Sequence, residues 1–134
     1  MYPVYFHFDC FYSELKSLFN KAFIYWHATG YGSDPDEYPE KQEHFGITTV
    51  EAMSAGCIPV VIDSAGQQET VSHAENGFLW NSKNELIKYT KKAINLNAPE
   101  AKKIHGNGQT VVKKFNKDTF TKNTEGIFSK LTRT

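Results

Sequence analysis

The chain has 134 residues, of which 40% are hydrophobic and 22% are charged, and its formal net charge at pH 7 is +0. This length fits one compact domain with one hydrophobic core, and this composition argues against disorder. No apolar run approaches the roughly 18 to 20 residues that a membrane-spanning helix needs. We therefore expect a single domain over residues 1–134 and no membrane span.

The cysteines and the first residues bear on the location of the protein. Cys10 and Cys57 are the two cysteines, and Cys57 stands beside an apolar strand pattern. This favours a reduced intracellular protein over a disulfide scaffold. Met1 is followed by YPVYFHFDCF, which has neither the basic start nor the small-residue cleavage site of a signal peptide. The expected location is cytoplasmic.

Charge is divided between the two parts of the sequence. Residues 1–82 hold 3 Lys or Arg against 11 Asp or Glu, a net charge of −8, whereas residues 83–134 hold 12 against 4, a net charge of +8. Two interpretations of the basic part stay open. It forms the solvated faces of surface helices, or it meets an acidic partner domain or an anionic membrane surface, as in a membrane-peripheral full-length protein. It lacks the interleaved aromatic residues of a single-strand binder, which argues against nucleic acid as a partner.

The first segments of the chain predict a strand, a helix and a second strand. YPVYFHF, residues 2–8, alternates around Tyr, Val and Phe as a strand does. SELKSLFNKAF follows as a helix with Ser13 at its N-cap and apolar residues along one face. FIYWHA, residues 23–28, then has the pattern of a buried strand.

The middle of the chain predicts a long loop, a helix and a buried strand. A polar loop with several Gly and Pro residues runs from Thr29 to about Glu43, and loops of this length are often functional. ITTVEAMSAG, residues 47–56, is the next predicted helix, with Gly56 as its C-cap. CIPVVID, residues 57–63, is a near-continuous apolar run, which is typical of a strand covered on both faces in a parallel sheet.

The remainder predicts a loop over residues 64–77, a short strand GFLW, and two or three amphipathic helices in SKNELIKYTKKAINL, PEAKKIHGNGQTVVKKF and KDTFTKNTEGIFSKL. Strands that alternate with helices indicate an α/β fold, here a Rossmann-like parallel sheet flanked by helices. In such sheets ligands bind beyond the carboxyl ends of the strands. The loops after FIYWHA and CIPVVID are therefore the expected sites.

The stretch from Glu43 to Glu51 combines two carboxylates with a helix N-terminus. The unpaired N–H groups of a first helical turn near Ile47, with the helix dipole, form an anion site. Gly46 has no Cβ, so a phosphate can approach the backbone closely. Glu51 lies one turn deeper on the side of Thr48, where its carboxylate can accept hydrogen bonds from a ribose diol. Glu43 would lie on the other side of the phosphates, beside a sugar.

Other interpretations of the polar residues are weaker. Glu40-x-x-Glu43-His44 resembles the inverted zinc motif, but a Glu stands where the first His should be. The histidines show no ligand-like i,i+4 pair, so we expect no metal site. His27 ends a predicted strand, where two roles stay open: an active-site residue, or a histidine that braces the core or the loop.

Residues 43–79, EHFGITTVEAMSAGCIPVVIDSAGQQETVSHAENGFL, carry a more specific pattern. Two glutamates separated by seven residues, with F-G-I between them, are followed by E-A-M-x-A-G-x-x-P-V-V, a glycine-containing loop with a glutamate, and N-G-F. This pattern resembles the signature of GT-B retaining glycosyltransferases of the family 4 type, typified by sucrose synthase, glycogen synthase and bacterial mannosyltransferases. The similarity covers most of residues 4–130.

The resemblance implies a role for each residue of the expected site. Glu43, the expected catalytic residue, would bond hydroxyls of the donor sugar, and Glu51 would bond the ribose. The backbone of four other donor-binding residues would hold the pyrophosphate: Phe45, Gly46, Ile47 and Thr48. Two further residues, Gly66 and Gln67, would line the site near the nucleotide. Neither a divalent metal nor a cofactor is expected in this fold type, and the partner is a GDP-, UDP- or ADP-hexose donor.

The resemblance also implies what this sequence does not contain. The family uses an upstream Arg and Lys to neutralise the phosphates, and an amino-terminal domain to bind the acceptor. Before Glu43 the chain has only Lys16, Lys21 and Lys41, none in the expected context. We therefore expect an incomplete carboxyl-terminal half of a two-domain enzyme that is inactive alone. An exposed apolar surface near YPVYFHF would favour its self-association.

The expected function is transfer of a hexose from a nucleotide-diphosphate sugar to an acceptor, with retention at the anomeric carbon. The segment WHATGYG…YPEKQEHFGITTVEAM looks closest to mannosyltransferases of lipid-linked oligosaccharide assembly, which favours a mannose or glucose donor. Two alternatives stay open. One is a non-catalytic nucleotide-binding or assembly domain on the same scaffold, which has no use for Glu43. The other is a sugar-nucleotide epimerase, against which the E-H-F-G-I pattern argues.

Overall fold

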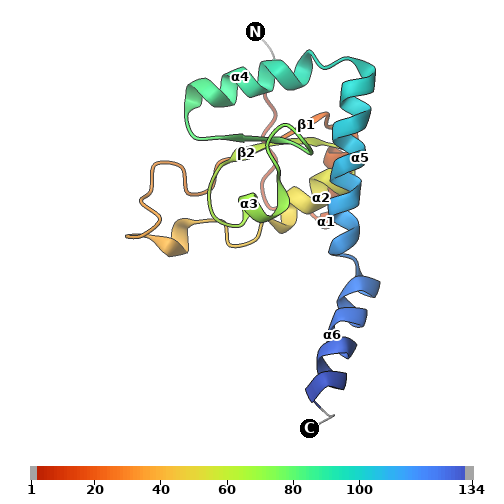
Figure 1. Cartoon of the computed structure of the whole chain (residues 1–134). Helices are drawn as coiled ribbons and strands as arrows, with labels where there is room; N and C mark the ends of the chain where they lie inside the picture. Colours follow the sequence, from red (N-terminus) through yellow and green to blue (C-terminus); the bar gives the residue numbers. More distant parts are fainter. Residues whose placement is uncertain (1–2, 132–134) are drawn as a thin grey trace.

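The computed structural model describes residues 3–131 of the chain. A parallel sheet with strand order β1-β2-β3 lies between helices on both of its faces (Figure 1). This confirms the predicted α/β fold class. The elements in chain order are α1 (Tyr12–Lys21), β1 (Ile24–His27), η1 (Pro39–Lys41), α2 (Ile47–Ser54), β2 (Ile58–Ile62), α3 (Gln67–Thr70), β3 (Phe78–Trp80), α4 (Lys83–Ile94), α5 (Ala98–Lys114) and α6 (Lys117–Leu131).

Strand β2 is the centre of the core, and all five of its residues are buried. Val60 pairs with Trp26 of β1 and with Phe78 of β3, so the three strands run parallel in one register. Alternate residues of β2 join side chains of β3, α4 and α5 in the main apolar cluster: Ile58, Val60, Ile62, Phe78, Trp80, Ala93 and Ile104. The near-continuous apolar run of β2 therefore reflects cover on both faces, as predicted.

Helix α4 covers one face of the sheet, and α2 lies on the other (Figure 1). On the α2 side, Ala52 and Met53 are buried. Helix α5 packs against α2 there, and a Cβ on Gly108 of α5 would lie 3.6 Å from the Met53 sulfur. The small residue on α5 lets the two helices approach closely.

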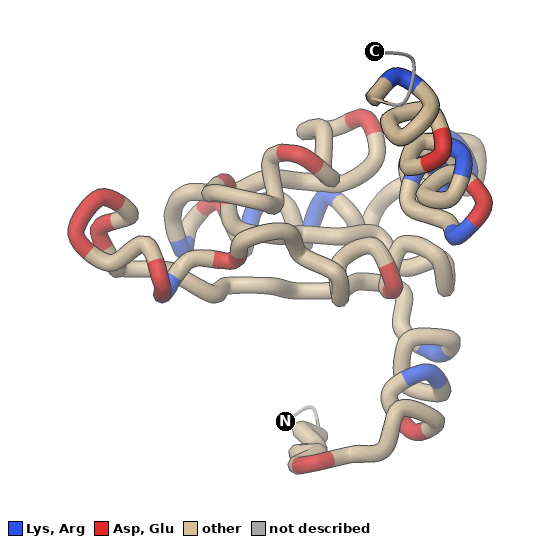
Figure 2. The backbone as a smooth tube through the Cα atoms, turned by 90° about the horizontal axis from the view of Figure 1, so that it is seen from below, with Lys and Arg blue, Asp and Glu red and all other residues tan. Residues whose placement is uncertain are grey.

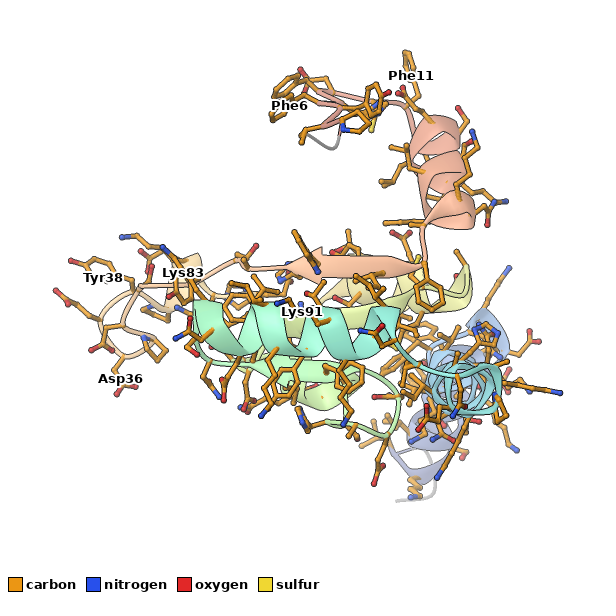
Figure 3. The ribbon with its side chains drawn as sticks, turned by 90° about the horizontal axis from the view of Figure 1, so that it is seen from above. Phe6, Phe11, Asp36, Tyr38, Lys83 and Lys91 are labelled. Atoms are coloured by element: carbon orange, nitrogen blue, oxygen red, sulfur yellow. The ribbon has the colours of Figure 1, made fainter. Side chains whose placement is uncertain are left out.

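The predicted strand over residues 2–8 is wrong for residues 3–8, which form no strand; Tyr2 lies outside the described residues. A strand needs a neighbour for its N–H and C=O groups, and the described sheet does not include this segment. The segment instead lies away from the sheet, with Phe6 and Phe11 on its outer part (Figure 3). Its aromatic side chains are exposed, Phe8 at 81%. The predicted self-association stays a prediction.

The FIYWHA segment is a strand, as predicted, but it is less buried than predicted. Trp26 is 60% exposed, and the other three residues of β1 are half-buried. In the described sheet β1 is an edge strand with β2 as its neighbour. The start of α1 also differs by two residues. Phe11 is at the N-cap of α1, and Ser13, the predicted cap, lies inside the helix.

Helix α2 ends at a glycine, as predicted, but Gly56 is the residue after the C-cap and not the C-cap itself. Ala55 is the C-cap, and Gly56 follows with a left-handed backbone, φ 99°. The N–H of Gly56 donates to the carbonyl of Met53 at 3.1 Å, and that of Cys57 to Ala52 at 2.9 Å. This pair of hydrogen bonds is a Schellman motif, which turns the chain directly into β2.

The region over residues 64–77, predicted as a loop, contains the short helix α3. The three carboxyl-terminal helices are present as α4, α5 and α6. Helix α6 leaves the body of the molecule beyond the end of α5 (Figure 1). Within residues 3–131, no helix is long and apolar enough to cross a membrane.

Candidate functional site

The candidate site lies where β1 and β2 end side by side, since His27 pairs with Val61. The loops that follow these two strands meet there. The N–H of Gly66 donates to the carbonyl of Glu43 at 2.9 Å, and Gly46 begins α2 at the same place. Two loops and a helix N-terminus therefore converge at the carboxyl edge of the sheet, as the fold predicts.

Glu43 lies at this meeting point with its carboxylate turned toward the start of α2. One oxygen, Oε1, accepts hydrogen bonds from the N–H groups of Gly46 at 3.0 Å and Phe45 at 3.4 Å. The other oxygen, Oε2, lies 3.3 Å from Nε2 of His27, and the Glu43 side chain is 29% exposed. Both oxygens are thus held in place while the group still reaches solvent.

Two buried side chains orient the imidazole that faces Glu43. The Thr49 hydroxyl donates to Oε1 of Gln67 at 2.9 Å, which turns the Gln67 amide nitrogen toward Nδ1 of His27 at 3.2 Å. Because an amide nitrogen only donates, Nδ1 accepts, and the proton of the neutral imidazole sits on Nε2, facing Glu43. Thr49 and Gln67 are both 0% exposed. This chain of hydrogen bonds sets the position of the carboxylate.

The same contacts determine the charge of Glu43. Burial raises the pKa of the carboxyl group, but the N–H groups of Gly46 and Phe45 and the imidazole of His27 together outweigh it, so the pKa of Glu43 lies below its ordinary value. Glu43 is therefore an anion at neutral pH. An ionised carboxylate only accepts hydrogen bonds, which suits it to bind hydroxyl groups.

Gly46 is required by both its conformation and its surroundings. It is the N-cap of α2, with a left-handed backbone of φ 82°, and a Cβ there would lie 2.9 Å from Nε2 of Gln67. The N–H groups of Ile47 and Thr48 follow in the first turn, where a helix supplies no acceptor. Both of these residues are exposed. This end of α2 thus offers donors to an anion, although Glu43 already holds the N–H groups of Phe45 and Gly46.

Glu51 lies in the second turn of α2, on the side that borders α1. It is half-buried and borders a small cavity of about 160 Å³ against α1, lined also by Lys16 and Phe19. The predicted role of Glu51 in binding the ribose stays a prediction.

Tyr25 of β1 links the surroundings of the two glutamates. Its hydroxyl lies 2.8 Å from Oγ1 of Thr48. Burial raises the pKa of Tyr25, the hydroxyls of Thr48 and Thr49 lower it, and the charges of Glu43 and Glu51 raise it again. The phenol is thus within electrostatic reach of both carboxylates.

Gly66 and Gln67 act from the loop after β2. Gly66 is buried, and a Cβ on it would collide with the backbone of His44 and Phe45. Glycine at this position lets the two loops touch. Gln67 is a member of the hydrogen-bond chain behind Glu43. The structure thus brings Glu43, Phe45, Gly46, Gly66 and Gln67 into one cluster, with Ile47 and Thr48 at its exposed rim.

Comparison with known protein families matches residues 3–111 to the family described as "Glycosyl transferases group 1". The chain belongs to this family. The predicted resemblance to GT-B glycosyltransferases of the family 4 type is thereby confirmed. Among residues 3–131, no group of three or more His, Cys, Asp or Glu side chains could hold a metal ion; a metal-independent mechanism stays a prediction.

Two relatives of this glycosyltransferase chain come from Dictyostelium discoideum. It is 50% identical over 53 residues to GDP-Man:Man(3)GlcNAc(2)-PP-Dol alpha-1,2-mannosyltransferase, a match that covers 39% of this chain and 10% of the relative. It is 37% identical over 98 residues to Alpha-1,3/1,6-mannosyltransferase ALG2, which covers 70% of this chain and 23% of the relative. The chain thus spans less than a quarter of the length of each.

Solved structures of Anabaena HepE resemble this chain. The complex with UDP aligns with a TM-score of 0.59 and 28% identity, over 66% of this chain and 25% of that one. The complex with UDP-glucose aligns with a TM-score of 0.64 and 22% identity, over 87% of this chain and 30% of that one, and supports the fold alone. The GT-B assignment of the fold is thus confirmed.

The sequence does not predict the roles of two residues of the cluster. Thr49 and Tyr25 carried no motif, and their roles depend on contacts across the sheet edge. For His27 the sequence allows an active-site role or a bracing role, and in the structure His27 contacts the carboxylate of Glu43. The signal in the sequence for His27 is its position at the end of the predicted strand, before the loop that leads to Glu43.

Proposed function

We propose that this chain binds the donor in a glycosyltransferase that moves a hexose from a nucleotide-diphosphate sugar to an acceptor with retention at the anomeric carbon. The observation that carries the proposal is the Glu43 carboxylate, held anionic by His27, Phe45 and Gly46 directly beside the N-terminus of α2. Family membership and the mannosyltransferase relatives support it.

The two chemical needs of such a reaction match two parts of this cluster. The donor sugar presents hydroxyl groups, and the oxygens of Glu43 accept from hydroxyls. The leaving diphosphate gains negative charge, and the N–H groups of Ile47 and Thr48, with the dipole of α2, are oriented to stabilise it. Fixing these groups before the donor binds lowers the cost of orienting it.

The relatives indicate which donors to test first. One relative is named for GDP-mannose, and structures of HepE hold UDP or UDP-glucose. We propose GDP-mannose as the first donor to test, and UDP-glucose as the second. In this proposal the Glu51 carboxylate accepts hydrogen bonds from the ribose on the side of α2 that borders α1. A separate domain binds the acceptor.

One observation favours the alternative of a nucleotide-binding domain without catalysis. Glu43 caps the N–H groups of Phe45 and Gly46, which is also what a purely structural acid would do. The two functions differ in whether Glu43 distinguishes a nucleotide sugar from the nucleotide alone.

Calorimetric titration of the chain with GDP, UDP, ADP and their hexose conjugates tests the proposal. Binding is expected at about millimolar Kd, near −4 kcal/mol, because a helix N-terminus alone offers little charge. Glu51→Gln should weaken the binding of every ligand, whereas Glu43→Gln should weaken mainly the binding of the sugar conjugates. Glu69→Gln, at an exposed position, should leave the binding of both ligand types unchanged. Equal losses for both ligand types in both variants would refute the division of roles and leave the non-catalytic alternative.

A further inference from the structure

A second pocket lies beside the Glu43 cluster, at the carboxyl ends of β2 and β3. Its volume is about 440 Å³, and it is lined by the loop over residues 30–35, by Gln42, by Ile62, Asp63 and Ser64, and by Asn81. Glu43 does not line it. The loop extends from one end of the sheet in two views (Figures 1 and 3), where Asp36 and Tyr38 mark it.

Gln42 and Glu43 are neighbours whose side chains serve two different sites. Gln42 has an extended backbone, φ −84° and ψ 154°, in which successive side chains point to opposite sides. Glu43 turns toward His27 and Gly46, whereas Gln42 lines the second pocket. The two sites are therefore adjacent but distinct.

The Gln42 amide has a polar atom that no described residue satisfies. The side chain is buried, with 8% exposure. Its Oε1 accepts from the Ser64 hydroxyl at 3.0 Å, but among residues 3–131 its Nε2 has no hydrogen-bond partner. Rotating the amide by half a turn would exchange the two atoms and leave the oxygen unpaired instead. Because burying an unpaired polar atom costs free energy, a ligand that bonds it would recover that cost.

Glycine is required at position 30, next to the Gln42 amide. A Cβ on Gly30, which has a left-handed backbone, would collide with the amide of Gln42. The backbone of the loop after β1 thus lies close to the amide, and both residues line the pocket.

Asp63, which also lines the pocket, offers hydrogen-bond acceptors. Oδ1 of Asp63 accepts from Nε2 of Gln68 at 2.8 Å, and Oδ2 accepts from Nδ2 of Asn81 at 3.2 Å. Each carboxylate oxygen has more than one acceptor site, so Asp63 can still accept from a ligand. Gln42, with its unpaired N–H, and Asp63, with its carboxylate, therefore both line one pocket.

An aromatic side chain completes the wall. Tyr31 lines the pocket, and its ring packs against Trp80 with centroids 5.3 Å apart. With 42% of its area exposed, Tyr31 presents apolar surface beside the polar groups. Such a wall suits the C–H face of a sugar ring.

The charge of the surrounding loop excludes an anionic ligand. Asp34, Asp36 and Glu37 belong to the loop after β1, and Asp63 lines the pocket. Figure 2 shows acidic positions in red along the backbone. A phosphate would be repelled. A cation would find no use for the unpaired N–H of Gln42, so a neutral ligand whose groups both donate and accept fits best.

We propose that this pocket binds a neutral hexose unit, making it a second sugar subsite outside the Glu43 cluster. Hydroxyl groups accept from Nε2 of Gln42 and donate to Asp63, while the ring lies against Tyr31. The hexose comes either from an acceptor glycan or from the donor sugar, and the two sources are separable by experiment.

The test is a ¹H–¹⁵N NMR titration of the 134-residue chain with methyl α-mannoside, methyl α-glucoside, GDP and GDP-mannose. The side-chain amides of Gln42 and Asn81 and the backbone amides of residues 30–33 are the reporters. At least one glycoside is expected to shift these signals saturably at millimolar concentration, whereas GDP alone should not. If the shifts give a lower Kd for GDP-mannose than for the glycoside, the donor sugar is the source of the hexose. If the Kd for GDP-mannose is equal or higher, the acceptor glycan is the source.

Two variants sharpen this test. Gln42→Leu keeps about the same side-chain volume but removes the amide. It should weaken binding of the glycoside by about tenfold while the chain stays folded. Asn84→Leu, at an exposed position of α4, should leave binding unchanged. If neither glycoside causes a saturable shift, as when water alone bonds the amide, the proposal is overturned. It is also overturned if the Gln42→Leu chain binds the glycoside as the wild type does. Signals of Ile47 and Thr48 report the donor site separately, so the two proposals fail independently.

Discussion

The sheet-centred body and the two projecting ends of the molecule contain the same kinds of apolar side chain but bury them differently. In the body, Phe78 is 0% exposed and Trp80 2%, whereas Phe8 near the amino end is 81% exposed and Phe120 of α6 is 70%. Neither α1 nor α6 has a buried residue. An apolar pattern thus predicts which segments become helices, but burial requires a neighbouring element. Stability is accordingly concentrated in the body.

The largest expected effect contrasts two phenylalanines. Phe78→Ala removes a fully buried ring from the main cluster and should lower the free energy of unfolding by about 3–5 kcal/mol. Phe8→Ala, at an exposed position, should change it by less than about 0.5 kcal/mol. Urea denaturation followed by circular dichroism measures both. Comparable losses would mean that the amino end packs against a surface and that the contrast between body and ends is wrong.

A smaller effect contrasts two glycines. Gly66→Ala would force a Cβ into the backbone of His44 and Phe45, and should cost about 1–3 kcal/mol while displacing Glu43. Gly106→Ala, inside α5 with no atom near its Cβ, should stabilise by about 0.5–1 kcal/mol. Thermal unfolding of the two variants gives the sign of each. A Gly66→Ala chain as stable as the wild type would show that the two loops do not meet so closely.

The smallest effect is a pH dependence that arises at Glu43. Its pKa in the folded chain lies below the ordinary value of 4.5, so the ionised form stabilises the fold above that value, and this contribution is lost as pH falls through the folded pKa. The stability difference between the wild type and Glu43→Gln should therefore shrink on acidification from about pH 6 to about pH 3. Guanidinium denaturation across this range checks it. A constant difference would mean that the contacts to Gly46 and His27 do not stabilise the anion.

The sequence was sufficient for the elements of the body because their patterns are local. β2 is apolar at every position, and Gly56 stops α2 where a left-handed residue is needed. The strand predicted near the amino end failed because alternation describes one segment, whereas pairing depends on a neighbour. The alternating aromatic residues found no strand to pair with in the described chain.

The candidate site was predictable in part for the same reason. Glu43, Gly46 and Gln67 follow from the family pattern, and they do meet at the sheet edge. The chain of contacts from Thr49 to His27 could not be predicted, because it joins residues of α2, α3 and β1 that no spacing connects. The unpaired amide of Gln42 was equally out of reach, since only the folded loops reveal what surrounds it.

The two tryptophans, one exposed and one buried, give the molecule a pair of optical reporters. Trp26 is 60% exposed on β1, whereas Trp80 is 2% exposed and donates its indole N–H to the carbonyl of Val60 at 3.3 Å. A collisional quencher in solution therefore reaches the fluorescence of Trp26 well before that of Trp80. In a chain with Trp26→Phe, the remaining emission would come from beneath the ring of Tyr31, so its intensity would follow the movement of the loop after β1 with no added dye.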